Sequence, residues 1–131
     1  MDIVLVDTSV WINFFKAKET KASLFLKNNL NNIIIGTCPV IVQEVLQGIV
    51  SDKDFNSIIT YFNNLTRLTG NTYMLAHDAA KLYRELRKKG ITIRKPNDCL
   101  IAVYAMREGV ALLHDDRDFQ LISQYSSLKV I

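Results

Sequence analysis

A short apolar run leads directly into an acid and two hydroxyl residues in the stretch Ile3-Val4-Leu5-Val6-Asp7-Thr8-Ser9. An apolar run of this length, rich in β-branched residues, predicts a buried strand. The three polar residues that follow are all good N-caps for a helix, which we expect to continue to about Phe15. Capping by Thr8 or Ser9 would leave the Asp7 carboxylate for another role. A carboxylate directly after a buried strand is costly unless its charge is compensated.

The same order of strand and helix continues through the chain. Further strands are predicted at 33–35, where Gly36 is expected to stop the strand, and at 66–68, 111–113 and 128–131. Helices are predicted at about 21–30, 39–48, 52–63, 71–89, 96–108 and 119–124. No Asn-Gly or similar signal joins two strands as a hairpin, so the pattern predicts an α/β fold with a mainly parallel sheet and helices on both faces. Ligands of such sheets bind beyond the carboxyl ends of the strands.

Length and composition favour one globular domain spanning residues 1–131. The chain is 49% hydrophobic and 22% charged, which excludes a disordered protein. Its formal net charge of +3 permits a polyanionic partner without requiring one. Cys38 and Cys99 lack the spacing of a zinc site, and their apolar neighbours predict buried thiols in a reducing compartment. Because we see no secretory signal and no apolar run near the roughly 20 residues of a membrane span, we expect a cytoplasmic protein without membrane contact.

Three more acids stand at positions comparable to Asp7. Glu44 lies within an apolar helical stretch, Asp98 begins another, and Asp116 follows a predicted strand. Each has a simpler explanation: a solvated helix face, a favourable interaction with the helix dipole, and an exposed turn, respectively. Asp115 and Asp118 accompany Asp116, and spacing alone does not tell which of these three acids points inward.

Considered together, the four acids predict a cation site. Parallel strands bring their following loops to one edge of a sheet, where a divalent cation would compensate all four carboxylates at once. Oxygen ligands of this kind suit Mg²⁺ or Mn²⁺. Such an ion can lower the pKa of bound water and shield the charge of a phosphate group, so the first hypothesis is metal-dependent phosphoryl chemistry. No His or Lys stands out as a general base, and a metal mechanism needs none.

Four short motifs carry a resemblance to a known family. They are Val6-Asp7-Thr8-Ser9-Val10-Trp11-Ile12, Val42-Gln43-Glu44-Val45-Leu46-Gln47-Gly48, Asn97-Asp98-Cys99-Leu100-Ile101-Ala102 and Leu113-His114-Asp115-Asp116-Arg117-Asp118-Phe119. In this order, and over nearly the whole chain, they resemble the PIN-domain ribonucleases, and particularly the VapC-like toxins of toxin–antitoxin pairs. The resemblance implies a three-layer α/β/α sandwich and Mg²⁺- or Mn²⁺-dependent hydrolysis of RNA phosphodiester bonds by an endoribonuclease. It also implies a homodimer and inhibition by a cognate antitoxin protein.

The resemblance further implies roles for individual residues. The catalytic and metal-binding acids would be Asp7, Glu44, Asp98 and Asp116. Asp118 is also acidic and would share or assist the role of Asp116. Thr8 and Ser9 match a hydroxyl position that supports the metal or its water in the family.

Basic side chains are the candidates for contacts with RNA phosphates. The candidates are Arg84, Arg87, Lys88, Arg94, Lys95 and Arg117. Arg84, Arg87 and Lys88 belong to one predicted helix, and a solvated helix face explains that basic stretch equally well.

Three other functions share some of these features. A PIN-domain nuclease of RNA processing, outside any toxin–antitoxin pair, would have the same site. A phosphoacceptor receiver domain also places acids at strand ends and binds Mg²⁺, but it needs paired acids after its first strand, where this chain has Asp7 alone. The presence of all four acids argues against a binding module without catalytic activity.

Overall fold

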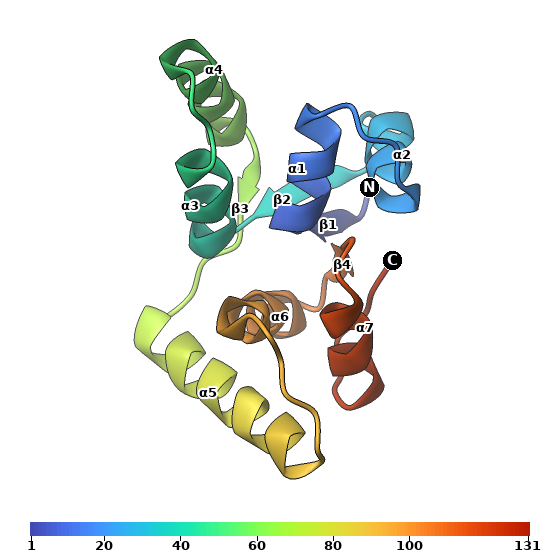
Figure 1. The fold of residues 1–131 in the computed structure, drawn as a ribbon, viewed down its shortest axis with the longest axis vertical. Helices are drawn as coiled ribbons and strands as arrows, with labels where there is room; N and C mark the ends of the chain where they lie inside the picture. The colour runs from blue at the N-terminus through green and yellow to red at the C-terminus, as the bar shows by residue number, and fades with distance from the viewer.

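A four-stranded, entirely parallel sheet forms the centre of the computed structural model, which describes residues 1–131 (Figure 1). The strands are β1 (Ile3–Val6), β2 (Ile34–Thr37), β3 (Thr66–Arg67) and β4 (Ala111–Leu113). Their order across the sheet is β3-β2-β1-β4, so the chain moves from β1 in one direction and later returns to the other side of β1. The predicted parallel sheet is confirmed.

Seven helices cover this sheet. They are α1 (Thr8–Phe15), α2 (Lys21–Asn29), α3 (Pro39–Gln47), α4 (Asp52–Asn63), α5 (Thr72–Lys88), α6 (Pro96–Glu108) and α7 (Arg117–Gln124). Helices α1 to α4 connect strands that progress in one direction, whereas α5 and α6 lead back across to β4. Because such crossovers are right-handed, the two sets lie on opposite faces. Figure 1 shows α1 and α2 on one side of the strands and α6 and α7 on the other, so the predicted three-layer α/β/α sandwich is confirmed.

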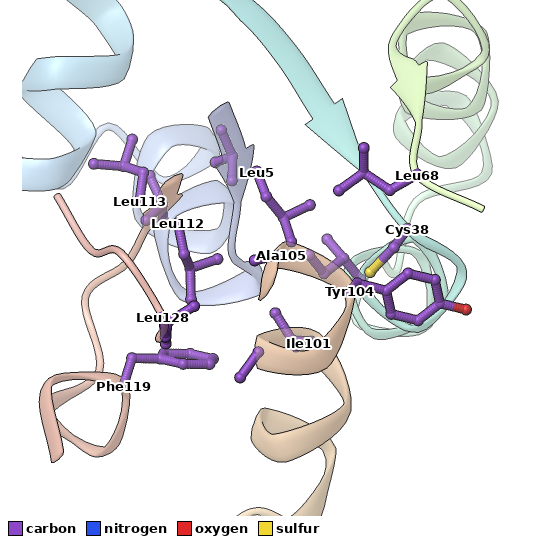
Figure 2. Packing of buried hydrophobic residues seen from close by; sticks show 14 of the residues in the cluster. Leu5, Cys38, Leu68, Ile101, Tyr104, Ala105, Leu112, Leu113, Phe119 and Leu128 are labelled. Atoms are coloured by element: carbon purple, nitrogen blue, oxygen red, sulfur yellow. The ribbon is translucent and has the colours of Figure 1, made fainter. Parts of the chain in front are cut away.

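Helix α6 occupies the middle of the core. Its residues are apolar on nearly all sides, and a helix with this composition is buried. Ile101 and Ala105 are completely inaccessible to solvent, as is Leu112 of β4. Figure 2 shows these side chains packed together with Phe119 and Leu5. Pro96 at the first turn and Gly109, which ends the helix with a φ of 64°, fix both ends of α6 as the sequence predicts.

Strand β2 differs from its prediction at Gly36. The sequence predicts that this glycine stops the strand, but Gly36 lies within β2 and pairs with Leu5 of β1 and Thr66 of β3. A Cβ atom on Gly36 would lie 3.1 Å from Cγ2 of Ile3. The glycine therefore permits a close approach between neighbouring strands, and the prediction that it ends the strand is wrong.

The predicted last strand at 128–131 is also wrong. Val130 forms a single parallel bridge with Leu112. Leu112 N–H donates to the carbonyl of Lys129 and Ile131 N–H donates to the carbonyl of Leu112, both at 2.9 Å. The apolar residues that suggested a strand are there because Leu128 packs into the core, which requires no extended pairing. No helix in the structure is long and apolar enough to cross a membrane.

The sheet positions two of the predicted acids as neighbours. Asp7 follows β1 and Asp116 lies three residues after the end of β4, and these two strands are adjacent. Since adjacent parallel strands end at the same edge of the sheet, Asp7 and Asp116 both lie beyond that edge. This is also where the strand order reverses, which is the usual ligand position in open α/β sheets.

The close packing at Gly36 generates a test of the fold. We expect Gly36→Val to lower the free energy of unfolding by about 1–3 kcal/mol, because the added atoms overpack the contact with Ile3. Urea denaturation measures this change. The control is Gly48→Ala, whose added Cβ would meet its nearest neighbour, the Val45 carbonyl, at 3.6 Å. That variant should stay within about 0.5 kcal/mol of wild type; an equal loss in both variants would contradict the packing argument.

Candidate active site

One carboxylate oxygen of Asp7 accepts hydrogen bonds at the start of α1, and the other has no hydrogen-bond partner. Its Oδ2 accepts hydrogen bonds from the backbone N–H of Ser9 at 2.9 Å and from the Ser9 hydroxyl at 2.5 Å. Asp7 is therefore the N-cap of α1, and neither Thr8 nor Ser9 takes that place. Its Oδ1 is buried and has no hydrogen-bond partner. Asp7 thus caps the helix and still offers an oxygen to a ligand.

The two predicted supporting hydroxyls tie neighbouring segments to Asp7. Thr8 Oγ1 donates to Oε1 of Glu44 at 2.7 Å, which holds the half-buried Glu44 of α3 beside the start of α1. Ser9 Oγ, besides donating to Asp7, accepts a hydrogen bond from Asp115 N–H at 3.0 Å. Burial raises the pKa of Asp7, the hydrogen bonds from Ser9 lower it, and the charge of Glu44 raises it further. The net direction is upward, so Asp7 is an uncompensated carboxylate.

Asp98 is the second buried acid without a compensating partner. It lies in the first turn of α6, is only 4% exposed, and its Oδ2 has no hydrogen-bond partner. Burial raises the pKa of Asp98 to about 8, with further contributions from the charges of Asp7 and Asp116. A neutral carboxyl group is the expected form at neutral pH when nothing binds it, whereas a cation would restore the charge.

The structure decides among the three acids after β4. Asp116 and Asp118 are buried, whereas Asp115 is exposed. The Oδ2 of Asp115 instead accepts hydrogen bonds from Asn13 and Thr20 at 2.9 and 2.7 Å. Asp116 caps α7, since its Oδ1 accepts from Asp118 N–H at 3.0 Å. The inward acids are therefore Asp116 and Asp118.

Two basic side chains compensate these inward acids. Arg94 reaches Asp116 Oδ1 through Nη2 at 3.2 Å and Asp118 Oδ2 through Nε at 3.3 Å. Lys95 Nζ lies 3.3 Å from Asp116 Oδ2. Burial raises the pKa of Asp116, but the Asp118 N–H and the Lys95 ammonium outweigh burial and lower it overall. The sequence predicts Arg94 and Lys95 as RNA contacts but gives no sign of these ion pairs, because residues more than 20 positions apart leave no local signal.

The residues present fit a divalent cation. Asp98, Asp116 and Asp118 each offer an oxygen, and these oxygens lie within 4.8 Å of one another. The unpartnered Oδ2 of Asp98 and Oδ1 of Asp7 are buried polar atoms that need a positive partner. A set of carboxylate oxygens suits Mg²⁺ or Mn²⁺. Asp7 and Glu44 are both outside this group of three, and Glu44 is held next to Asp7 by the hydrogen bond from Thr8.

The predicted basic residues fall into two groups. Arg94, Lys95 and Arg117 line an open depression of about 550 Å³ together with Ser9, Asp115 and Asp116. Arg84, Arg87 and Lys88 are exposed on α5 and do not line this depression. The structure therefore brings half of the predicted basic residues to the acids.

Comparison with known protein families shows which family this chain belongs to. The model of the PIN domain matches residues 4–124. The chain belongs to the PIN-domain family. The resemblance found in the sequence motifs is therefore confirmed, and the alternative of a receiver domain is wrong.

Relatives of this PIN domain cover almost its whole length. It is 33% identical over 129 residues to ribonuclease VapC11 of Mycobacterium tuberculosis and to a VapC ribonuclease of Mycobacterium bovis, matching 97% of this chain and 96% of each relative. Among solved structures, VapBC2 from Rickettsia felis, bound to a promoter DNA fragment, is 18% identical with a TM-score of 0.73, covering 98% of this chain and 97% of that one. VapBC-1 from nontypeable Haemophilus influenzae is 20% identical with a TM-score of 0.73, covering 98% and 96%. At these identities the solved structures support the fold.

The raised pKa of Asp98 generates a test in the absence of metal. Its folded-state pKa is about 8, whereas an unfolded Asp titrates near pH 4, so the folded protein binds the extra proton between these values. Wild-type stability should consequently fall as the pH rises from about 4 to about 8. In EDTA, Asp98→Asn should melt above wild type at about pH 8.5, and the difference should shrink toward pH 5. Asp2→Asn, at an exposed acid, is the control; a difference for Asp98→Asn that does not change with pH would contradict the assignment.

Proposed function

We propose that this PIN domain is a metal-dependent endoribonuclease that hydrolyses RNA phosphodiester bonds and acts as the toxin of a toxin–antitoxin pair. The observation that carries the proposal is the pair of buried, unpartnered oxygens on Asp7 and Asp98 beside Asp116. A fold without a ligand here would leave these oxygens as an unexplained cost. The VapC ribonucleases that cover nearly the same length support the same chemistry.

In this proposal Asp7, Asp98 and Asp116 would hold Mg²⁺ or Mn²⁺, and Glu44 adds negative charge next to Asp7. An ion held there would supply a water molecule of lowered pKa and stabilise negative charge on the phosphate. Ser9 orients the Asp7 carboxylate, and Thr8 orients Glu44. Asp118 is a positioning residue here: it accepts hydrogen bonds from the backbone N–H and Nε of Arg94, which fixes the segment before α6.

The basic residues of the depression are the proposed contacts for the RNA backbone. Arg117 is exposed beside Asp116 and forms no ion pair. Arg94 and Lys95 face the same opening. Arg84, Arg87 and Lys88 on α5 do not line this depression and remain candidates for contacts with a longer RNA. Phosphate contacts of this kind contribute affinity without reading the base sequence.

The proposed partners follow from the relatives. Several similar solved structures are VapBC complexes, which supports an antitoxin protein as the partner of this chain. We also propose a homodimer and a cytoplasmic location.

Expression of the chain alone should arrest growth, and co-expression of the antitoxin should relieve the arrest. A nuclease of RNA processing outside a toxin–antitoxin pair would not behave this way.

The acids of the site generate a direct test of the activity. We expect Asp7→Asn and Asp98→Asn to lower Mn²⁺-dependent RNA cleavage by at least about 100-fold, because losing a ligand should cost more than losing a residue that merely supports one. Asn retains the volume of the side chain and, at position 7, the ability to cap α1. Cleavage of a panel of labelled RNAs, with the fold checked by circular dichroism, measures the effect.

The matched control for this test is Asp115→Asn. Asp115 directly precedes Asp116 in the segment after β4, but it is exposed and its Oδ2 accepts hydrogen bonds from Asn13 and Thr20. Its variant should cleave RNA within a few-fold of wild type. Equal losses at Asp98 and Asp115, or wild-type cleavage by Asp98→Asn, would remove the proposed site.

The two basic groups generate a second test. Arg117→Gln should weaken RNA binding and reduce the slope of log affinity against log salt by about 0.7 or less, the value for one phosphate contact on a single strand. The combined variant Arg84→Gln, Arg87→Gln and Lys88→Gln should change the slope less for a short RNA. Fluorescence polarisation at several salt concentrations measures both slopes. A larger change in the α5 variant would place the RNA on that helix instead.

A further inference from the structure

Each carboxylate oxygen of Asp116 forms an ion pair with a basic side chain of the same protein. Arg94 Nη2 lies 3.2 Å from Oδ1, and Lys95 Nζ lies 3.3 Å from Oδ2. These two basic residues are consecutive and immediately precede α6, whose first turn carries Asp98. The ammonium of Lys95 therefore pairs with Asp116, while Lys95 itself directly precedes the helix turn that contains Asp98.

Arg94 and Lys95 are held in different ways. The backbone N–H of Arg94 and its Nε both donate to Asp118 Oδ2, at 3.1 and 3.3 Å, in addition to the contact with Asp116. Lys95 makes one ion pair, and 61% of its side chain is exposed. A flexible lysine with a single contact moves at little cost, whereas a guanidinium held at several points does not. Lys95 is therefore the mobile cation of the pair.

We propose that the Lys95 ammonium occupies Asp116 Oδ2 in the metal-free protein, releases this oxygen when a divalent cation binds, and then contacts an RNA phosphate. The inference rests on the proposed function, which supplies both the metal and the RNA. An ammonium group and a metal ion on the same carboxylate oxygen repel each other strongly at such distances. The open depression beside Arg117 gives the displaced side chain a place near the substrate.

Lys95 thus acts in two states of the site. Without metal it lowers the repulsion among the acids, since buried carboxylates require a positive partner. With metal bound, the same charge becomes available at the mouth of the site, where a phosphate would arrive. Arg94 stays on Asp118 in both states and keeps the segment before α6 in place.

Binding of Mn²⁺ alone tests the first half of the inference. Lys95→Met should bind Mn²⁺ about two- to fivefold more tightly than wild type, the range that one partly exposed ion pair supports. Its melting temperature in EDTA should be lower than that of wild type, and Mn²⁺ should raise it by a larger amount. Isothermal titration calorimetry and thermal denaturation measure these changes. Lys95→Arg keeps the positive charge and should not bind Mn²⁺ more tightly than wild type. Lys53→Met, at an exposed lysine of α4 without an ion pair, is the control.

Cleavage kinetics at saturating Mn²⁺ test the second half. Lys95→Met should raise KM for RNA several-fold while kcat changes less, because a contact with the substrate is lost after the metal is in place. Unchanged or weaker Mn²⁺ binding by Lys95→Met, or an unchanged KM, would overturn the inference.

The failure of the proposed function would look different. If wild type binds no Mn²⁺, or if Asp98→Asn binds it as tightly as wild type, the metal site itself is absent and both proposals fail. If Asp98→Asn abolishes Mn²⁺ binding while Lys95→Met leaves it unchanged, the proposed function stands and only the role of Lys95 is wrong.

Discussion

A hydrogen bond of 3.0 Å from Asp7 N–H to the carbonyl of Leu113 joins β1 and β4 at the edge where both strands end. Because the strands are parallel, the loops that follow them leave the sheet side by side, and each carries a buried acid. Helix α6, enclosed by apolar neighbours, brings Asp98 to the same edge. Negative charge is thereby concentrated where solvent screens it little, and the remainder of the site compensates for this concentration.

The compensation is incomplete, because basic side chains pair with two of these acids and not with the other two. Asp116 and Asp118 receive Arg94, Lys95 and the N-terminus of α7. Asp7 and Asp98 form no ion pair, and burial raises the pKa of both. If stability were the only requirement, replacing such carboxylates with apolar residues would raise the free energy of unfolding. Their presence beside a paired half of the site is the arrangement expected of a cation-binding centre, since a bound ion stabilises the folded state by mass action.

Features with a local cause were predictable from the sequence. The helix predicted at 96–108 is present with these bounds, because Pro96 suits a first turn and Gly109 takes the positive φ that ends α6. Features that depend on distant partners were not. The residues around Leu128 are apolar because they are buried, and burial does not distinguish a strand from a single bridge. Gly36 was predicted to end a strand, but the close approach of Ile3 from the neighbouring strand gives it a different role.

The same division applies to the site. Four acids, in the order of a PIN domain, predicted that carboxylates gather at one edge of the sheet, and the structure brings Asp98, Asp116 and Asp118 together there. The inward orientation of Asp116 and Asp118, and the outward one of Asp115, depends on the geometry of one turn and its contacts with Thr20. The pairing of these acids with Arg94 joins segments that no spacing rule connects.

We propose that Asp7 and Asp98, each with a buried oxygen that has no hydrogen-bond partner, belong to a metal site. A crystal of the protein soaked in Mn²⁺, with anomalous scattering data collected to locate the ion, tests it most directly. We expect one strong anomalous peak with Asp7 Oδ1, Asp98 Oδ2 and an oxygen of Asp116 as ligands, and with Lys95 Nζ moved away from Asp116. A peak elsewhere on the protein, or a soaked crystal in which Asp7 and Asp98 keep their unpartnered oxygens, would contradict it.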